Sequence, residues 1–96
     1  MDGSKQNKFA SYVGLAQRAN AVVYGEDIIL ERINIAKVVL IDSNASEKYK
    51  DRLNSKIKNC PVFVSEQLRE ALHRDNVNAV AITNDGLARA IIELLR

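Results

Sequence analysis

Val38-Val39-Leu40-Ile41 is a run of four apolar residues without polar alternation, and three of the four are β-branched. Such a run is typical of a strand that is buried on both faces of a sheet. Ala79-Val80-Ala81-Ile82 repeats the pattern near the C-terminus. Two strands of this kind predict a sheet sandwiched between helices, which is the α/β fold class.

The segments around these runs alternate between helical and extended patterns. Phe9, Tyr12, Val13 and Ala16 recur at i, i+3, i+4 and i+7, which predicts a helix with one apolar stripe. Strands separated by helical segments of roughly 10–15 residues again indicate alternating helices and strands. In chain order we expect helix 7–19, strand 21–24, helix 26 to about 34, strand 38–41, a helix to about 58, strand 62–64, a short helix, strand 79–82 and a final helix.

Several local features refine these elements. Ile28, Ile29 and Ile33 are expected to face inward from the second helix. Either Asn44, with Glu47 three residues later, or Ser46 can cap the third helix. Ser65 is expected to cap the short fourth helix and Thr83-Asn84-Asp85 the last one, and Gly14 inside the first helix indicates close packing of another element.

The chain has 96 residues, which predicts one domain over residues 7–96 behind a flexible polar tail of residues 1–6. No apolar run approaches the roughly 20 residues of a membrane span, so no membrane contact is expected. The single cysteine, Cys60, cannot form an intramolecular disulfide and fits a reducing, cytoplasmic location.

Residues for the common catalytic chemistries are missing or dispersed. One histidine, His73, and one cysteine cannot form a Cys/His zinc cluster, and the four glycines are too scattered for a phosphate-binding loop. His73 is expected in a solvated loop and Cys60 as a small buried hydrophobe. The sequence therefore predicts a protein that is not an enzyme, with no catalytic residue, metal, cofactor or small-molecule substrate.

The net charge is only +2, so the distribution of charge matters more than its sum. Residues 47–58 hold five basic against two acidic residues, whereas residues 22–34 hold three acidic and one basic residue. A basic helix can contact phosphates, or can be the solvated face of an amphipathic helix. Composition and pattern alone indicate an α/β domain.

Four stretches together carry a family pattern over nearly the whole chain. They are GLAQRA (14–19) with YGED (24–27), AKVVLID (36–42) with NASE (44–47), CPVFV (60–64) with Leu68, and VAITNDGLARAI (80–91). In order and spacing they resemble the superfamily of kink-turn RNA-binding ribosomal proteins (the L-seven-Ae and L-thirty-e type), and within it the short bacterial YlxQ-like proteins.

This resemblance implies a three-layer α/β/α sandwich around a four-stranded mixed sheet. It also implies binding of structured RNA, ribosomal RNA included, at one edge formed by residues 25–32, 42–46 and 73–78. Unstacked bases and helix-start N–H groups suit such an edge. The expected RNA-contacting residues are Arg18, Gly25, Glu26, Asp27, Arg32, Lys37, Asn44, Lys48, Arg74 and Asn76.

The second helix departs from the family pattern. Members typically follow the glycine with an Asn-Glu or Lys-Gln pair and then a lysine, whereas this chain has Glu26, Asp27 and later Glu31. These acids suit the start of a helix dipole but repel phosphate. The sequence therefore predicts an RNA binder that does not recognise kink-turns in the usual way. The alternative is a protein–protein adaptor that retains the fold without RNA binding.

Overall fold

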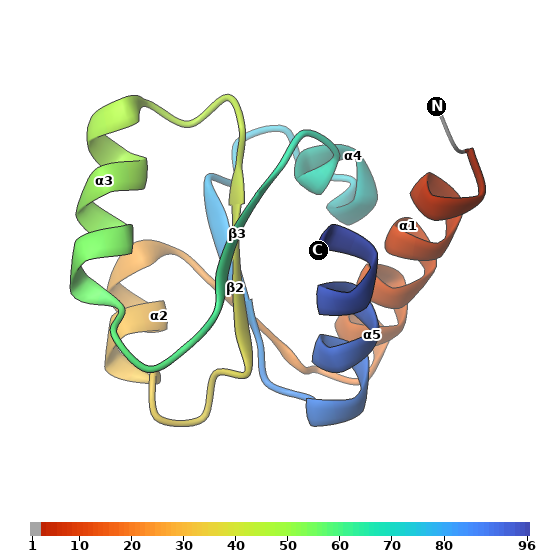
Figure 1. The fold of residues 1–96 in the computed structure, drawn as a ribbon, viewed down its shortest axis with the longest axis horizontal. Helices are drawn as coiled ribbons and strands as arrows, with labels where there is room; N and C mark the ends of the chain where they lie inside the picture. The colour runs from red at the N-terminus through yellow and green to blue at the C-terminus, as the bar shows by residue number, and fades with distance from the viewer. Residues whose placement is uncertain (1–2) are drawn as a thin grey trace.

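The computed structural model describes residues 3–96, which fold into three layers (Figure 1). One face of the sheet is covered by α1 (Gly3–Arg18), α4 (Leu68–Leu72) and α5 (Asp85–Leu95). The other face is covered by α2 (Glu26–Glu31) and α3 (Glu47–Lys56). The sheet consists of β1 (Val22–Tyr24), β2 (Val38–Asp42), β3 (Val62–Ser65) and β4 (Ala79–Ile82). The predicted sandwich of alternating helices and strands is confirmed.

The four strands lie in the order β1-β4-β2-β3. β2 and β3 are parallel, whereas β4 is antiparallel to both of its neighbours, so the sheet is mixed, as predicted. The two continuous apolar runs form the central strands β2 and β4, and every residue in both is buried. Both faces of a central strand are covered by helices, which explains why neither run needs polar alternation.

Successive side chains of a strand point to opposite faces, so β2 contributes to both halves of the core. Val38 and Leu40 pack with α1, α4 and α5. Val39 and Ile41 pack with α2 and α3, where Leu53 supplies a fully buried side chain. Tyr49, Leu53 and Ile57 therefore belong to the layer by which α3 and the residue after it are held on the sheet.

Two helix boundaries differ from the sequence predictions by three residues or more. α1 begins at Gly3 rather than at residue 7, so residues 3–6 of the expected tail are helical, and residues 1–2 lie outside the described residues. α2 ends at Glu31 instead of near residue 34, because the chain turns after Arg32, whose carbonyl accepts a hydrogen bond from the Ile35 N–H. The inward orientation of Ile28 was wrong. Ile29 is the buried residue of this helix and Leu30 packs beside it against the core, whereas Ile28 is 43% exposed.

The expected close packing at Gly14 was also wrong. A Cβ atom there would meet only the Arg18 guanidinium, at 3.6 Å, which is ordinary contact distance. The surface beside Gly14 is instead a hollow between α1 and α4. No helix in residues 3–96 combines the length and the apolar character needed to cross a bilayer.

Two polar side chains cap the start of a helix, and a third stabilises the turn before one. Ser46 caps α3, since its hydroxyl accepts a hydrogen bond from the Tyr49 N–H at 3.1 Å, which decides between the two cap candidates. Asn84 caps α5 in the same way through the Leu87 N–H. The Ser65 hydroxyl binds the Gln67 N–H in the turn before α4, so it precedes the helix rather than capping it.

Candidate nucleic-acid interface

The three segments expected to form the binding edge meet at one end of the sheet. The strand register places Tyr24 opposite Val80, and Ile41 opposite Ala79. β1 and β2 therefore end where β4 begins. Residues 25–27, 42–46 and 73–78 consequently lie together, and we call this end of the molecule the Gly25 edge. The turn after β2 and the loop before β4 lie at the top of Figure 1.

Gly25 joins β1 to α2 in a conformation that glycine adopts far more readily than other residues, with φ 89° and ψ 146°. Its N–H points to the carbonyl of Ala79, and its own carbonyl accepts the first hydrogen bond of α2 from Ile29. A Cβ atom at this position would meet nothing within 4 Å. Backbone conformation therefore requires the glycine, and the space beside it stays open for a ligand.

A hollow of about 270 Å³ opens beside Gly25. This volume is slightly below the roughly 300–1,000 Å³ of typical small-molecule sites, so the hollow suits a single planar group, such as one base, rather than a large ligand. Its lining combines two aromatic rings, two amide side chains and backbone: Tyr24, Gly25, Tyr49, Asn76, Val77, Asn78 and Ala79. Aromatic faces and amides are the groups that proteins use to stack and hydrogen-bond an unpaired base.

The Tyr24 ring is held from two sides. The amide of Gln17 on α1 donates hydrogen bonds to the Tyr24 hydroxyl and to the Leu72 carbonyl, each at 3.1 Å. The Arg74 guanidinium lies 4.4 Å from the centre of the Tyr24 ring, within cation–π distance. Arg74 therefore brings a positive charge next to the hollow.

A buried carboxylate organises the loops of the Gly25 edge. Asp42 is 1% exposed and accepts hydrogen bonds from the backbone N–H groups of Asn44 and Arg69. The Arg69 guanidinium lies 3.5 Å from the same carboxylate and donates to the Val77 carbonyl at 2.9 Å and to the Asn78 amide oxygen at 2.8 Å. Arg69 thus ties the loop before β4 to the end of β2.

Sequence reasoning missed Arg69. A signal was present, because an aspartate directly after a buried strand is almost never fully buried unless it is paired. That rule predicts a cation from a neighbouring element, and Arg69 follows the next strand along the chain. The sequence does not say which of the nearby cations takes the position.

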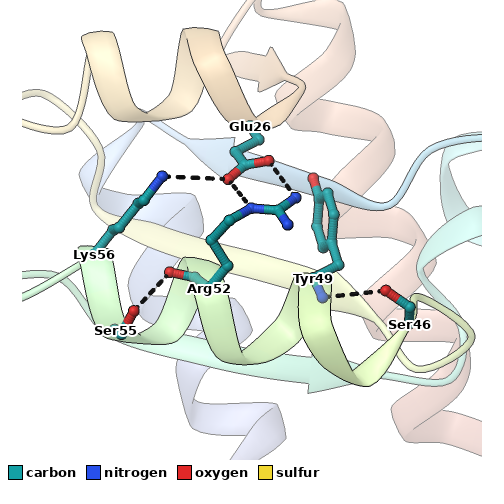
Figure 2. A network of polar contacts seen from close by, with 6 residues as sticks. All are labelled: Glu26, Ser46, Tyr49, Arg52, Ser55 and Lys56. Carbon is teal, nitrogen blue, oxygen red and sulfur yellow. Dashed lines mark hydrogen bonds and ion pairs between the residues drawn. The ribbon is translucent and has the colours of Figure 1, made fainter.

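Glu26, at the start of α2, faces the α3 helix (Figure 2). Its carboxylate receives a bidentate pair from the Arg52 guanidinium, at 2.6 and 2.7 Å, and the Lys56 ammonium lies 3.9 Å away. Its side chain is only 17% exposed. Of the three acids that were expected to repel phosphate, Glu26 is therefore neutralised within the protein.

This pairing and the packing around it shift two pKa values. The hydrogen bond from Arg52 lowers the pKa of Glu26, opposed by partial burial and assisted by the charges of Arg52 and Lys56. Burial raises the pKa of Tyr49, and the nearby carboxylates act in the same direction. Tyr49 therefore keeps a neutral hydroxyl next to the hollow at neutral pH.

The remaining predicted contact residues fall into three groups. Asn44 is exposed in the turn after β2, and Lys48 is exposed in the first turn of α3, so both belong to the Gly25 edge. Arg18 lines a separate hollow of about 420 Å³ between α1 and α4, together with His73. Arg32 and Lys37 lie at the opposite end of the sheet, where the Lys37 N–H binds the carbonyl of Ile82, the last residue of β4.

The residues considered for chemistry take structural positions. His73 is exposed and ends α4 in a left-handed conformation, as expected of a loop residue. The Cys60 thiol is partly buried against the Ala36 carbonyl at 3.6 Å, and burial raises its pKa. Within residues 3–96, no three His, Cys, Asp or Glu side chains are grouped so that they could hold a metal ion.

Comparison with known proteins places the chain among relatives. It is 32% identical over 90 residues to the RNA-binding protein YlxQ of Bacillus subtilis, an alignment that covers 86% of this chain and 90% of that protein. This chain belongs to the YlxQ family. No protein-family model matches the sequence.

Two solved structures share the fold of this YlxQ family member. A protein of unknown function from Bacillus halodurans superposes with a TM-score of 0.81 at 23% identity, covering 91% of this chain and 95% of that one. A 15.5 kD RNA-binding protein from Giardia lamblia superposes with a TM-score of 0.68 at 19% identity, covering 99% and 88%. The α/β/α architecture of this chain is therefore a known one.

Proposed function

We propose that this chain is an RNA-binding protein that holds an unpaired base in the hollow of the Gly25 edge. The relation to YlxQ, which is named an RNA-binding protein, is the observation that carries the proposal. The geometry supplies the means: aromatic faces, amide groups and open backbone meet at one place. Structured RNA exposes unpaired bases at loops and bulges, which is where sequence-specific recognition generally occurs.

Each group at the edge has a distinct role in this proposal. The Tyr49 and Tyr24 rings provide apolar walls for a base, and the amides of Asn76 and Asn78 hydrogen-bond its edges. The backbone can approach closely at Gly25 because no side chain projects there. Lys48 and Arg74 contact the flanking phosphates. None of these roles requires bond making, and we propose a binding protein rather than an enzyme.

The acidic start of α2 changes the expected mode of recognition. Glu26 is held by Arg52 and Lys56, so its carboxylate oxygens already accept hydrogen bonds within the protein and are not directed to the hollow. Asp27 is exposed without a resolved ion pair among residues 3–96. We therefore propose that the hollow and the loop before β4 dominate RNA contact, rather than the first turn of α2, so that standard kink-turn recognition is not expected.

The finer identity of the partner is part of the same proposal. We infer a structured RNA, with ribosomal RNA as the first candidate, and a cytoplasmic location in which residues 7–96 act as one RNA-binding domain. The adaptor alternative rested on the acidic helix start. Because Glu26 is paired inside the protein, Asp27 is the acid of the first turn that is left for a protein partner, which makes the adaptor the second candidate.

The test is a titration of the full chain with labelled RNA that contains an internal loop, alongside the same RNA with the loop fully paired. Affinity must fall as salt rises, since bound phosphates release counterions. Asn76→Asp removes an amide donor and adds a charge that repels phosphate, and we expect binding of the looped RNA to weaken about tenfold or more. Asn54→Asp, an exposed position on α3 outside the hollow, is the matched control.

Two results would contradict this proposal. One is the absence of RNA binding by the unaltered chain at low salt. The other is an equal loss of affinity in the Asn76→Asp and Asn54→Asp variants, which would mean that the hollow is not involved. Recovery of protein partners that persist after nuclease treatment, without RNA binding, would favour the adaptor.

A further inference from the structure

The end of the sheet opposite the Gly25 edge carries a group of basic side chains. The segment between α2 and β2 contributes Arg32 and Lys37, and the end of α3 with the following loop contributes Lys56 and Lys58. These segments are adjacent, because the Cys60 thiol contacts the Ala36 carbonyl. They form the two loops at the bottom of Figure 1. We call this group of four cations the basic end.

A third hollow lies within the basic end. It measures about 350 Å³ and is lined by Ile33, Asn34, Lys56, Lys58 and Asn59. Two lysines and two asparagines are among the residues that line it, and no acidic residue does. Ammonium and amide N–H groups are donors that suit the oxygens of a phosphate. A hollow lined by basic and amide residues without an acid is a feature that an ordinary solvated helix face does not need.

The cations of the basic end are largely free. Among residues 3–96, Arg32, Lys37 and Lys58 form no ion pair with a carboxylate, and only Lys56 has one, at 3.9 Å from Glu26. Lys37 lies close enough to Cys60 that its charge lowers the pKa of the thiol, against the larger effect of burial. The basic end therefore keeps most of its positive charge available to a ligand.

The Gly25 edge has no such excess. Its exposed cations Lys48 and Arg74 are offset by the exposed acids Asp27 and Asp75. At the basic end the nearby exposed acid is Glu31, whereas Asp85 is paired with Arg89 at 2.8 Å. Electrostatic attraction for a polyanion is accordingly stronger at the end that lies away from the base-sized hollow.

We propose that the basic end is a second RNA-contacting surface, which binds phosphates of a segment beyond the one held at the Gly25 edge. This inference rests on the proposed RNA-binding function and adds a separate surface to it. β2 has five residues, so the two surfaces lie roughly 15 Å or more apart along the strand direction. The base and its flanking phosphates are thus bound at the Gly25 edge, and the phosphates of a further RNA segment are bound at the opposite end of the same small domain.

The contribution of the basic end can be measured from the salt dependence of the affinity for RNA. Each neutralised phosphate contributes about 0.7–0.9 to the slope of log affinity against log salt concentration. The triple variant Arg32→Gln, Lys37→Gln, Lys58→Gln removes three free cations from exposed positions. We expect it to lower the magnitude of the slope by about 2 and to weaken binding on the order of 100-fold at about 0.1 M salt.

The experiment uses the full chain and two RNAs that share one internal loop. The long RNA has flanking helices that reach past α3, and the short RNA is truncated next to the loop. The matched control is Lys5→Gln, Lys8→Gln, Arg96→Gln, which removes the same number of positive charges elsewhere on the surface. Circular dichroism and thermal melting establish that both triple variants are folded before binding is measured.

The proposal predicts that the first triple variant loses slope and affinity with the long RNA, and much less with the short one, while the control changes little. An unchanged slope with the long RNA overturns the second surface, as does an equal loss in the control. Failure of the second surface can be told apart from failure of the proposed RNA-binding function. In the first case the unaltered chain still binds looped RNA and Asn76→Asp still weakens it, whereas in the second case the unaltered chain binds no RNA.

Discussion

Replacing Arg69 by Met removes the cation of the buried Asp42 carboxylate while keeping much of the apolar side-chain volume. The variant loses two guanidinium hydrogen bonds, to Val77 and Asn78, each worth on the order of 1 kcal/mol. Leaving Asp42 without its cation adds about 1 kcal/mol, a value kept small because the Arg69 side chain is 29% exposed. We expect a loss of about 3 kcal/mol in the free energy of unfolding.

Urea unfolding followed by circular dichroism measures this loss directly. For a domain of this size, a loss of about 3 kcal/mol corresponds to a fall of roughly 12–24 °C in Tm. Arg89→Met is the control, since its ion pair with Asp85 joins two exposed side chains and contributes about 0.5 kcal/mol or less. In a double-mutant cycle with Asp42→Asn, the combined loss should be smaller than the sum of the single losses.

The position of the lost contacts gives a second readout. Val77 and Asn78 line the hollow, so the Arg69→Met variant should also show faster amide hydrogen exchange over residues 73–79 and weaker RNA binding. The reasoning about Arg69 is refuted if the variant unfolds within about 0.5 kcal/mol of the unaltered chain, a change typical of surface substitutions. Unchanged exchange in this loop would refute the proposed tie between the loop and β2.

Two further substitutions test the Gly25 edge. Gly25→Ala should lower the free energy of unfolding by about 1–3 kcal/mol, because alanine is strained at φ 89°. Gly86→Ala, in the helical first turn of α5, should be neutral or stabilising. Equal stability of the two variants in urea unfolding would contradict this reasoning. Glu26→Gln should destabilise the protein at neutral pH. Folding lowers the pKa of Glu26. The contribution of its carboxylate to the free energy of unfolding is therefore present above the pKa of the unfolded chain, about 4.5, and disappears as pH falls through the lower pKa of the folded protein. Unfolding curves of both proteins should therefore converge in acid, and a difference that persists there would disprove the assignment.

The elements that the sequence predicted most accurately are those whose residue pattern depends on burial alone. β4 was placed at its observed bounds, and β2 differs by one residue, because a continuous apolar run is stable only between two covering layers. The α2 helix was placed less well. Its isoleucines continue beyond Arg32 in sequence, but the chain turns there to enter β2, so the periodicity extends past the true end of the helix.

Sequence patterns could not predict which side chains pair across the fold. Glu26 and Arg52 are 26 residues apart, and their pairing depends on α2 and α3 lying side by side on one face of the sheet. The same holds for Arg69 and Asp42, 27 residues apart. The resemblance grouped Arg32 with the edge at the start of the second helix, and Lys37 was also expected to contact RNA, yet strand direction places both residues at the other end of the sheet. Such assignments require the strand order, which local periodicity does not contain.

The strand order also constrains when the molecule can fold as it is synthesised. β4 lies between β1 and β2, so neither the first strand nor the inner side of the second has a sheet neighbour until residues 79–82 exist. A nascent chain that ends before Ala79 can pair only β2 with β3, and a two-stranded ribbon is marginal in water. Because β4 contributes to both core layers and α5 to one of them, most of the native sheet can form only after residues 79–82 have been synthesised. The Gly25 edge depends on the same step, since the register of β4 brings the end of the preceding loop, residues 73–78, beside Gly25.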